Sequence, residues 1–225
     1  MQEKDIIDRL RSLGSAEARA GMARYGIDTG RAFGVPVSTL RPLAREIGRD
    51  HDLAQDLWAS GFHEARLLAT MIADPRQMTE AAMESWVVDF DSWDVCDGAC
   101  INLFRKTPFA HARTQAWSGR DEPFVKRAGF ALMATLAVHD KRAEDAVFLG
   151  YLPIIAGAAA DERNFVKKAV NWALRQIGKR NRALNAAAIA CAEGLAERES
   201  KAARWITRDA LRELASEKVQ TRLTN

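Results

Sequence analysis

The chain has 225 residues, of which 48% are hydrophobic and 28% charged, and its formal net charge is +3. This composition excludes a disordered chain and a collagen-like repeat, and the length suffices for one sizeable core or an array of packed helices. Alanine occupies 40 positions, valine and isoleucine 11 each, and proline 6, so good helix formers outnumber strand formers. We therefore predict an all-α protein.

Membrane and secretory classes are not favoured. The longest apolar stretches, 130–138 and 149–160, are shorter than the roughly 20 residues that span a bilayer, and charge begins at Glu3. Three cysteines are an odd count, which fits a reducing compartment better than a disulfide framework. We expect a soluble cytoplasmic monomer with no membrane partner.

Charge is distributed unevenly along the chain. Residues 1–112 hold 13 Lys/Arg and 17 Asp/Glu, whereas residues 113–225 hold 20 and 13, so the halves carry −4 and +7. Within 163–192 there are seven Lys or Arg and no acid, and within 77–104 there are six acids and no base. The basic run predicts a local field of +7 that would attract a polyanion.

Helical segments recur along the chain without a linker rich in Gly, Ser or Pro, so we predict one domain over residues 1–225. The breaks between them fall at 34–36, 74–75, 107–108, 122–123 and 161–162. Four stretches are similar to one another, because each has charged residues near its start and apolar residues after them. They begin at Glu64, Lys126, Lys167 and Ala203. The last three are spaced by 41 and 36 residues. A period near 40 made of helix pairs is typical of HEAT-like repeats, so we predict an α-solenoid with a concave basic groove.

The first candidate site residue is Asp97, in a predicted helix that follows Phe90. On a helical wheel Asp97 lies on an apolar side, which it shares with Trp93, Cys100, Ile101 and Phe104. Ser92 as an N-cap and Asp94 in the first turn are explained by helix chemistry, but Asp97 is not. A buried carboxylate is costly unless it is compensated. Asp97 is therefore a site candidate, and a salt bridge to a neighbouring repeat is the alternative.

The second anomaly is Arg127, on the apolar side of a predicted helix over 124–138. Its planar guanidinium needs an anionic partner on this apolar side, and either Asp97 or a phosphate could be that partner.

The third anomaly is a tryptophan on a basic helix face, in a predicted helix over 165–179. Four side chains fall within about 60° of one another on the wheel, namely Lys168, Trp172, Arg175 and Lys179. The opposite side is covered by Ala169, Val170, Ala173, Leu174 and Ile177. Trp172 can stack on a ligand from this position; the alternative is a ring covered by Lys and Arg stems.

Metal and cofactor motifs are missing from the sequence. It has no Gly-rich phosphate loop, no His-Glu-x-x-His and no Gly-x-Ser-x-Gly, and its four histidines are scattered. Cys96 and Cys100 lie one helical turn apart with no second ligand pair, which does not favour zinc. We predict that the protein needs no metal and no cofactor.

Several of these segments are similar to one known family. They are Met22-Ala-Arg-Tyr25, Phe33-Gly-Val35 with Leu40-Arg41, Ser92-Trp-Asp-Val-Cys-Asp97, Lys126-Arg127-Ala, and Phe165-Val-Lys-Lys-Ala-Val-Asn-Trp-Ala-Leu-Arg175. The sequence resembles the HEAT-like-repeat DNA alkylation repair family, the AlkD-type alkylpurine DNA glycosylases, over residues from about 20 to 180. The Trp-Asp-x-x-Asp and Lys-Ala-x-x-Trp-x-Leu-Arg motifs in this order are the specific part of the resemblance.

This resemblance implies a monofunctional glycosylase that excises cationic N3- and N7-alkylpurines from duplex DNA without a metal, in base excision repair near the nucleoid. Asp97 matches the catalytic aspartate, and Trp93 and Trp172 match two tryptophans that flank the deoxyribose of the lesion. Arg127 and Arg175 match arginines that bind the DNA backbone, and Tyr25 matches an aromatic residue near the lesion strand. Lys168 and Lys179 complete the expected DNA-binding set.

Two positions depart from the family pattern. Pro36 stands where a polar side chain is usual, and Asn164 replaces an aromatic residue beside Phe165. Both bear on activity and lesion range. The alternatives to a glycosylase are a non-enzymatic HEAT-like module that recognises DNA structure and a protein-interaction scaffold, for which the basic run would be a solvated face.

Overall fold

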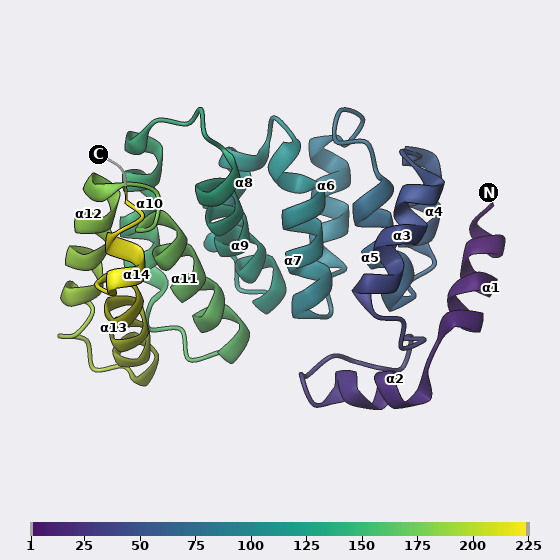
Figure 1. Cartoon of the computed structure of the whole chain (residues 1–225), viewed down its shortest axis with the longest axis horizontal. Helices are drawn as coiled ribbons and strands as arrows, with labels where there is room; N and C mark the ends of the chain where they lie inside the picture. Colours follow the sequence, from purple (N-terminus) through teal and green to yellow (C-terminus); the bar gives the residue numbers. More distant parts are fainter. Residues whose placement is uncertain (1, 224–225) are drawn as a thin grey trace. The chain divides into compact units, whose positions relative to one another are not determined.

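The computed structural model describes residues 2–223, and within this range every regular element is helical and no strand occurs. The prediction of an all-α protein is confirmed. The chain forms two compact units, unit 1 over Met1–Pro108 and unit 2 over Phe109–Asn225. The prediction of a single domain over 1–225 stays a prediction, and each unit is described by itself (Figure 1).

Unit 1 is built around one buried helix. Its elements are α1 (Glu3–Leu13), α2 (Ala16–Ala23), α3 (Val37–Ile47), α4 (His51–Ala59), α5 (His63–Ile72), α6 (Glu80–Val88), α7 (Trp93–Asn102) and the 3₁₀ turn η1 (Phe104–Lys106). Helix α5 packs against α1, α3, α4 and α7. Between α4 and α6, the indoles of Trp58 and Trp86 stack with their centroids 4.0 Å apart.

Unit 2 is also built from consecutive packed helices, most of which are longer than those of unit 1. Its elements are α8 (Ala110–Ser118), α9 (Pro123–His139), α10 (Asp145–Ala158), α11 (Asn164–Ile177), α12 (Arg182–Gly194), α13 (Lys201–Leu214) and α14 (Glu217–Gln220). Helix α9 packs against α8 and α11, and α11 packs against α13. Helices α10 and α12 cover the other side of α11.

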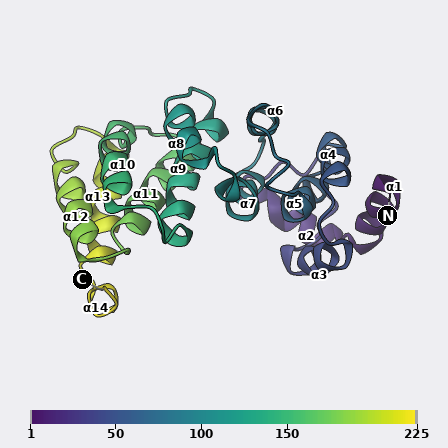
Figure 2. The same ribbon diagram turned by 90° about the horizontal axis from the view of Figure 1, so that it is seen from above.

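Each unit therefore has two layers of helices. The odd-numbered layer consists of α3, α5 and α7 in unit 1 and of α9, α11 and α13 in unit 2. Figure 2 shows α4 and α6 on one side of this layer in unit 1. The four similar sequence stretches lie in α5, α9, α11 and α13. Four of the five predicted breaks fall outside the α-helices, and the fifth spans the N-cap Glu122 and the first residue of α9, Pro123. The repeats found in the sequence are thus the helices of the odd-numbered layer.

Small side chains allow these helices to approach closely. At Gly129 of α9, an added Cβ would lie 2.5 Å from the backbone nitrogen of Ser118 and 3.0 Å from the carbonyl oxygen of Thr114. No side chain fits there, because real Cβ atoms do not come this close to backbone. Glycine at this position lets α8 and α9 pack backbone to backbone.

A buried carboxylate anchors the segment between α2 and α3. Glu64 of α5 is fully buried, and its Oε2 accepts a hydrogen bond from the backbone nitrogen of Phe33 at 2.9 Å. Its Oε1 accepts bonds from the backbone nitrogens of Gly34 at 2.7 Å and Val35 at 3.1 Å. Three amide donors that would otherwise be unpaired are satisfied by one charge, which compensates its burial.

The Glu64→Gln variant tests this anchor. A glutamine can accept two of the bonds, but its amide nitrogen then faces the amide of Phe33, so we expect a loss of about 2 kcal/mol in unfolding free energy. Denaturant unfolding measures this loss, and the exposed Glu17→Gln serves as the control. A Glu64→Gln protein as stable as the control would contradict the anchoring role.

Candidate DNA-binding site

Helix α7 begins at Trp93, and its first turn is held by α5. Ser92 occupies the N-cap position as predicted, and its side chain accepts no cap hydrogen bond. Asp94 instead bonds the ring of His63 through Oδ2, with 2.9 Å between Nε2 and Oδ2, and its Oδ1 accepts a bond from the amide of Val95 at 3.1 Å. The start of α7 is therefore fixed by a polar contact to α5.

The His63–Asp94 pair shifts both pKa values. Burial opposes the charged imidazole, but the hydrogen bond and charge of Asp94, with Glu64 and Asp91 nearby, outweigh it and raise the pKa of His63 above 6.5. Burial likewise opposes the charged carboxylate, yet the bond and charge of His63 lower the pKa of Asp94 below 3.8. The pair is held as an ion pair at mildly acidic pH.

Two of the predicted residues meet in unit 1. The indole nitrogen of Trp93 donates to the backbone carbonyl of Tyr25 at 3.1 Å, although the two are 68 residues apart in sequence. The Tyr25 side chain is 70% exposed in the turn after α2. Trp93 is half-buried, so an aromatic surface remains open to a ligand at this point.

Asp97 lies on the partly exposed side of α7. The buried residues of this helix are Val95, Cys96, Ala99 and Cys100. Asp97 and Trp93 are half-buried, and Ile101 is 37% exposed. Of the apolar neighbours expected for Asp97, Cys100 and Phe104 are buried, but Asp97 itself is only half-buried, and its role as a site residue stays a prediction. The small side chains of α7 face the core because they permit close packing, and the bulky Trp93 and Ile101 remain with Asp97 toward solvent.

Trp172 belongs to unit 2, where its ring is half-buried and packs against the core. The residues predicted for the opposite side of α11 are all fully buried, namely Ala169, Val170, Ala173, Leu174 and Ile177. The face of α11 is as predicted, but the helix ends at Ile177, so Lys179 lies in the following turn.

Two cations of the basic run are paired with acids of α13. Arg175 pairs with Glu213 and lies 3.4 Å from Asp209, and Lys179 pairs with Glu213 at 2.7 Å. Burial alone would raise the pKa of Glu213, but these two cations lower it. Acids distant in sequence thus lie beside two of the seven cations, and the predicted local field over 163–192 stays a prediction.

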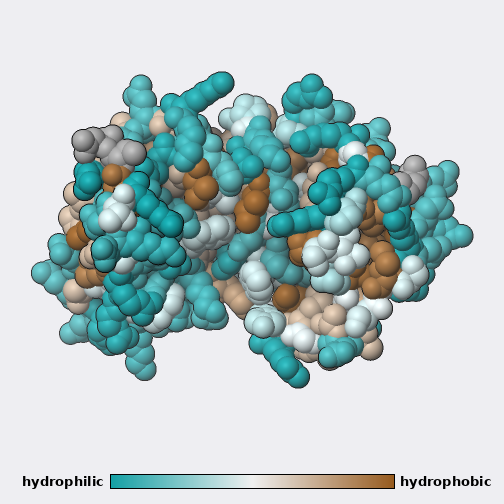
Figure 3. Space-filling view, viewed as in Figure 1, coloured by the Kyte–Doolittle hydropathy of each residue, from teal (hydrophilic) through white to brown (hydrophobic). Residues whose placement is uncertain are grey.

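Other cations of the run are also engaged, and Lys168 remains exposed. Arg163 pairs with Asp161 at 2.6 Å, and the side-chain nitrogen of Lys167 lies 5.2 Å from the ring centroid of Trp205. The surface over α11 and α13 is largely hydrophilic in Figure 3, and apolar patches gather over α3 and α5 of unit 1. Unit 2 thus presents a hydrophilic surface on which some cations are paired and others, such as Lys168, are exposed.

Arg127 is a structural residue in this fold. Its side chain is only 6% exposed, and Nη1 donates to the backbone carbonyl of Phe165 at 2.6 Å, which joins α9 to the start of α11. The sequence analysis expected Asp97 or a phosphate as the partner of Arg127, whereas the acceptor in this hydrogen bond is a backbone carbonyl. Its role as a DNA contact stays a prediction.

Sequence reasoning missed His63, Glu64, Asp209 and Glu213. One signal could have found them, because polar partners recur at a fixed offset. In unit 1 the pairs His63–Asp94, Trp58–Asp89 and Gln55–Trp86 are each 31 residues apart. In unit 2 Asn171–Asp209 and Arg175–Glu213 are each 38 apart. These separations of 31 and 38 residues are the lengths of the structural repeats in the two units. The similar stretches in the sequence gave that length only approximately.

Within residues 2–223, no three or more His, Cys, Asp or Glu side chains are grouped so that they could hold a metal. None of the described helices is long and apolar enough to cross a membrane.

Comparison with solved structures defines the class of fold. One solved structure matches 95% of this chain with 96% of its own, with a TM-score of 0.80 and 21% identity. It is described as a new family of proteins related to the HEAT-like repeat DNA glycosylases with affinity for branched DNA structures. The HEAT-like repeat fold is thereby confirmed, and the concave basic groove stays a prediction.

The chain belongs to the family of the DNA alkylation repair enzyme, whose model matches residues 6–214. The resemblance inferred from the sequence motifs is confirmed by this match. No curated protein matches the chain significantly.

The ion pair at the start of α7 predicts a pH dependence of stability. A raised pKa of His63 gives stability that is present below pH 6.5 and lost as pH rises through the folded value. A lowered pKa of Asp94 gives stability that is present above pH 3.8 and lost as pH falls through the folded value. The contribution is therefore largest between these two limits.

We expect Asp94→Asn to lose about 2 kcal/mol in unfolding free energy near pH 5.5, and less near pH 8.5. Denaturant unfolding at both values measures the difference, with the exposed Asp56→Asn of α4 as the control. A loss that grows with rising pH would show that the pair does not act as an ion pair.

Proposed function

We propose that the protein excises cationic N3- and N7-alkylpurines from duplex DNA by hydrolysis of the N-glycosidic bond. The observation that carries this proposal is the side of α7 on which Asp97 and Trp93 lie partly exposed, with the Trp93 indole tied to the segment of Tyr25. Membership of the DNA alkylation repair enzyme family supports it.

Hydrolysis of this N-glycosidic bond is favoured by a negative charge and an electron-rich ring beside the sugar. An alkylated purine is cationic, so it leaves as a neutral base without being protonated, and positive charge develops on the deoxyribose. The Asp97 carboxylate stabilises this charge, and the face of Trp93 favours a cation. A water adds to C1′ as the C–N bond breaks, and Asp97 orients it and accepts its proton. Trp172, which the resemblance matches to a second tryptophan at the deoxyribose, lies in unit 2, and that role stays a prediction.

The cations of unit 2 bind the DNA backbone in this proposal. Lys168 is exposed and ready for a phosphate, whereas Arg175 and Lys179 are held by Glu213. A phosphate presents the same charge and oxygen acceptors as a carboxylate, so it can replace Glu213 as their partner. Glu213 would then order the two cations in the free protein and compete with DNA for them.

A second candidate function is binding of branched DNA without excision. It is favoured by the similar structure, which is described as having affinity for branched DNA, and by Pro36 and Asn164, which depart from the glycosylase pattern. Both functions use DNA, so only product formation separates them.

Asp97→Asn tests the catalytic assignment. The variant keeps the shape of the side chain and removes its charge, so we expect it to bind duplex DNA as the wild type does and to lose about 10²- to 10³-fold in base release. The measurement is free 7-methylguanine and 3-methyladenine from methylated duplex DNA without added metal. The exposed Asp52→Asn of α4 is the matched control.

Three results decide between the functions. A wild type that releases no base but prefers a four-way junction to a linear duplex supports the branched-DNA function instead. Release by wild type with a fully active Asp97→Asn keeps the glycosylase and removes Asp97 from its site. Absence of binding to any DNA favours the protein-interaction scaffold.

Glu213→Gln tests the competition for Arg175 and Lys179. Removing this carboxylate frees two cations for phosphates, so we expect duplex affinity to rise about 3- to 10-fold and the log–log salt slope to steepen by about one. Glu217→Gln, an exposed change on α14 with the same loss of charge, corrects for the net charge. Affinity equal to that of Glu217→Gln would show that Arg175 and Lys179 do not contact DNA.

A further inference from the structure

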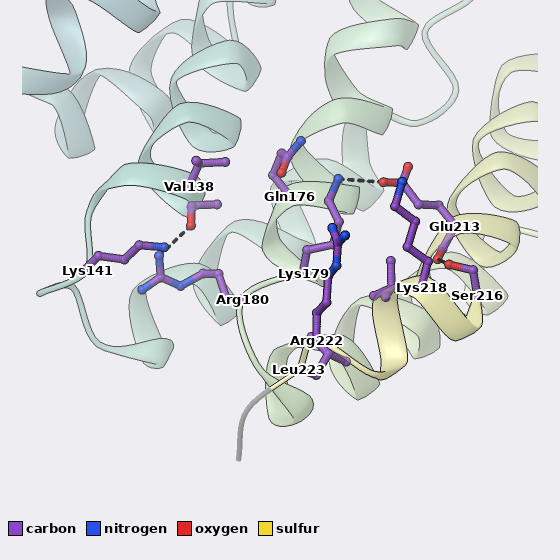
Figure 4. Close-up of a pocket in the computed structure, with 12 residues that line it drawn as sticks. Val138, Lys141, Gln176, Lys179, Arg180, Glu213, Ser216, Lys218, Arg222 and Leu223 are labelled. Atoms are coloured by element: carbon purple, nitrogen blue, oxygen red, sulfur yellow. Dashed lines mark hydrogen bonds and ion pairs between the residues drawn. The ribbon is translucent and has the colours of Figure 1, made fainter.

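An open pocket of about 600 Å³ lies in unit 2 where the ends of α9, α11 and α13 meet α14. Its charged lining consists of Lys141, Lys179, Arg180, Lys218, Arg222 and Glu213. Figure 4 shows that these side chains come from the loop after α9, from the turn after α11, from the last turn of α13 and from the chain that follows α13. Five cations and one acid thus surround one cavity.

Two of the five cations are explained by the fold itself. Arg180 donates to the carbonyls of Ala137 and Asp140 at 2.7 and 2.9 Å, and its guanidinium lies 3.9 Å from the ring centroid of Phe148. Lys179 is paired with Glu213. Cations at helix C-termini are favoured by the helix dipole and by unpaired carbonyls, so neither residue requires a ligand.

The other three cations have no such explanation. Lys141, Lys218 and Arg222 are exposed at the rim, and within residues 2–223 no carboxylate forms a salt bridge with any of them. Like charges gathered around one cavity repel one another, and a bound anion removes that cost. The arrangement therefore favours an anionic ligand with several acceptor oxygens.

The rest of the lining indicates which anion fits. Val138 is 38% exposed, and with Val219 and Leu223 it gives the pocket an apolar part beside the cations. The pocket also continues the predicted DNA-binding face of α11, because Lys179 belongs to both. A sugar carrying a phosphate matches this combination of apolar and cationic lining.

We propose that this pocket binds a backbone phosphate of DNA through Lys141, Lys218 and Arg222, beyond the contacts of Lys168 and Arg175. The proposal rests on the proposed DNA binding and adds a second phosphate site at the C-terminal end of α11. It assigns a role in DNA affinity to α14, a four-residue helix, and to the chain that follows it.

The test compares two triple variants of the full-length protein. The pocket variant carries Lys141→Ala, Lys218→Ala and Arg222→Ala. The control variant carries Lys201→Ala, Arg204→Ala and Arg208→Ala, three exposed cations of α13 outside the pocket. Both lose the same net charge, so a difference between them reports position and not total charge. Thermal unfolding shows that both are folded before binding is measured.

Binding of a fluorescein-labelled unmodified duplex is titrated at several salt concentrations. We expect the pocket variant to bind about 10- to 100-fold more weakly than wild type near 100 mM salt, with a log–log slope shallower by about two. The control variant stays within about threefold of wild type, because it removes no phosphate contact. AMP is titrated in parallel as a free phosphorylated probe.

Each outcome has one meaning. Equal DNA binding by the pocket and control variants overturns the pocket assignment and leaves the proposed function intact. Binding of AMP that depends on the pocket, with DNA binding unchanged, also overturns it and assigns the pocket to a free phosphorylated ligand. If wild type binds no DNA, the proposed function fails, and the pocket assignment fails with it.

Discussion

The stacking of each helix of the odd-numbered layer on the next is the constraint on which both units depend. It brings residues one repeat apart into contact, at an offset of 31 residues in unit 1 and 38 in unit 2. Alanine and glycine line these contacts, so the helix backbones come close and few large side chains separate them. A polar residue on one helix therefore meets its partner on the next helix rather than on its own, and the electrostatics follow from this register.

In unit 1 two neighbouring residues of α5 organise the candidate site. Glu64 fixes the backbone of residues 33–35, and His63 fixes the first turn of α7 through Asp94. Trp93, at the start of that turn, then bonds to the carbonyl of Tyr25. The two segments that carry the aromatic residues are thus positioned by one helix, and the surface that Asp97 shares with Trp93 rests on buried polar contacts.

In unit 2 the same stacking brings cations of α11 and its following turn into contact with acids of α13. Asp209 and Glu213 lie one helical turn apart on α13 and meet Arg175, and Glu213 also meets Lys179. A protein that binds a polyanion gains from cations that are ordered in advance, since less side-chain entropy is lost on binding. The cost is competition from the ordering carboxylates, which makes affinity depend on how readily a phosphate replaces them.

The sequence by itself determined the helical class, the breaks between helices and the residues that form the core of α11, because alanine content and a 3.6-residue period are local properties. It also determined the family, through motifs that are contiguous along the chain. Only the tertiary structure decided which side of α7 is buried, that Arg127 bonds Phe165, and that acids of α13 pair with two cations of the basic run. Those outcomes depend on contacts with a residue about one repeat away along the chain. The similar sequence stretches are too weakly conserved among themselves to give the exact number of residues between such partners, so the partner could not be identified from the sequence.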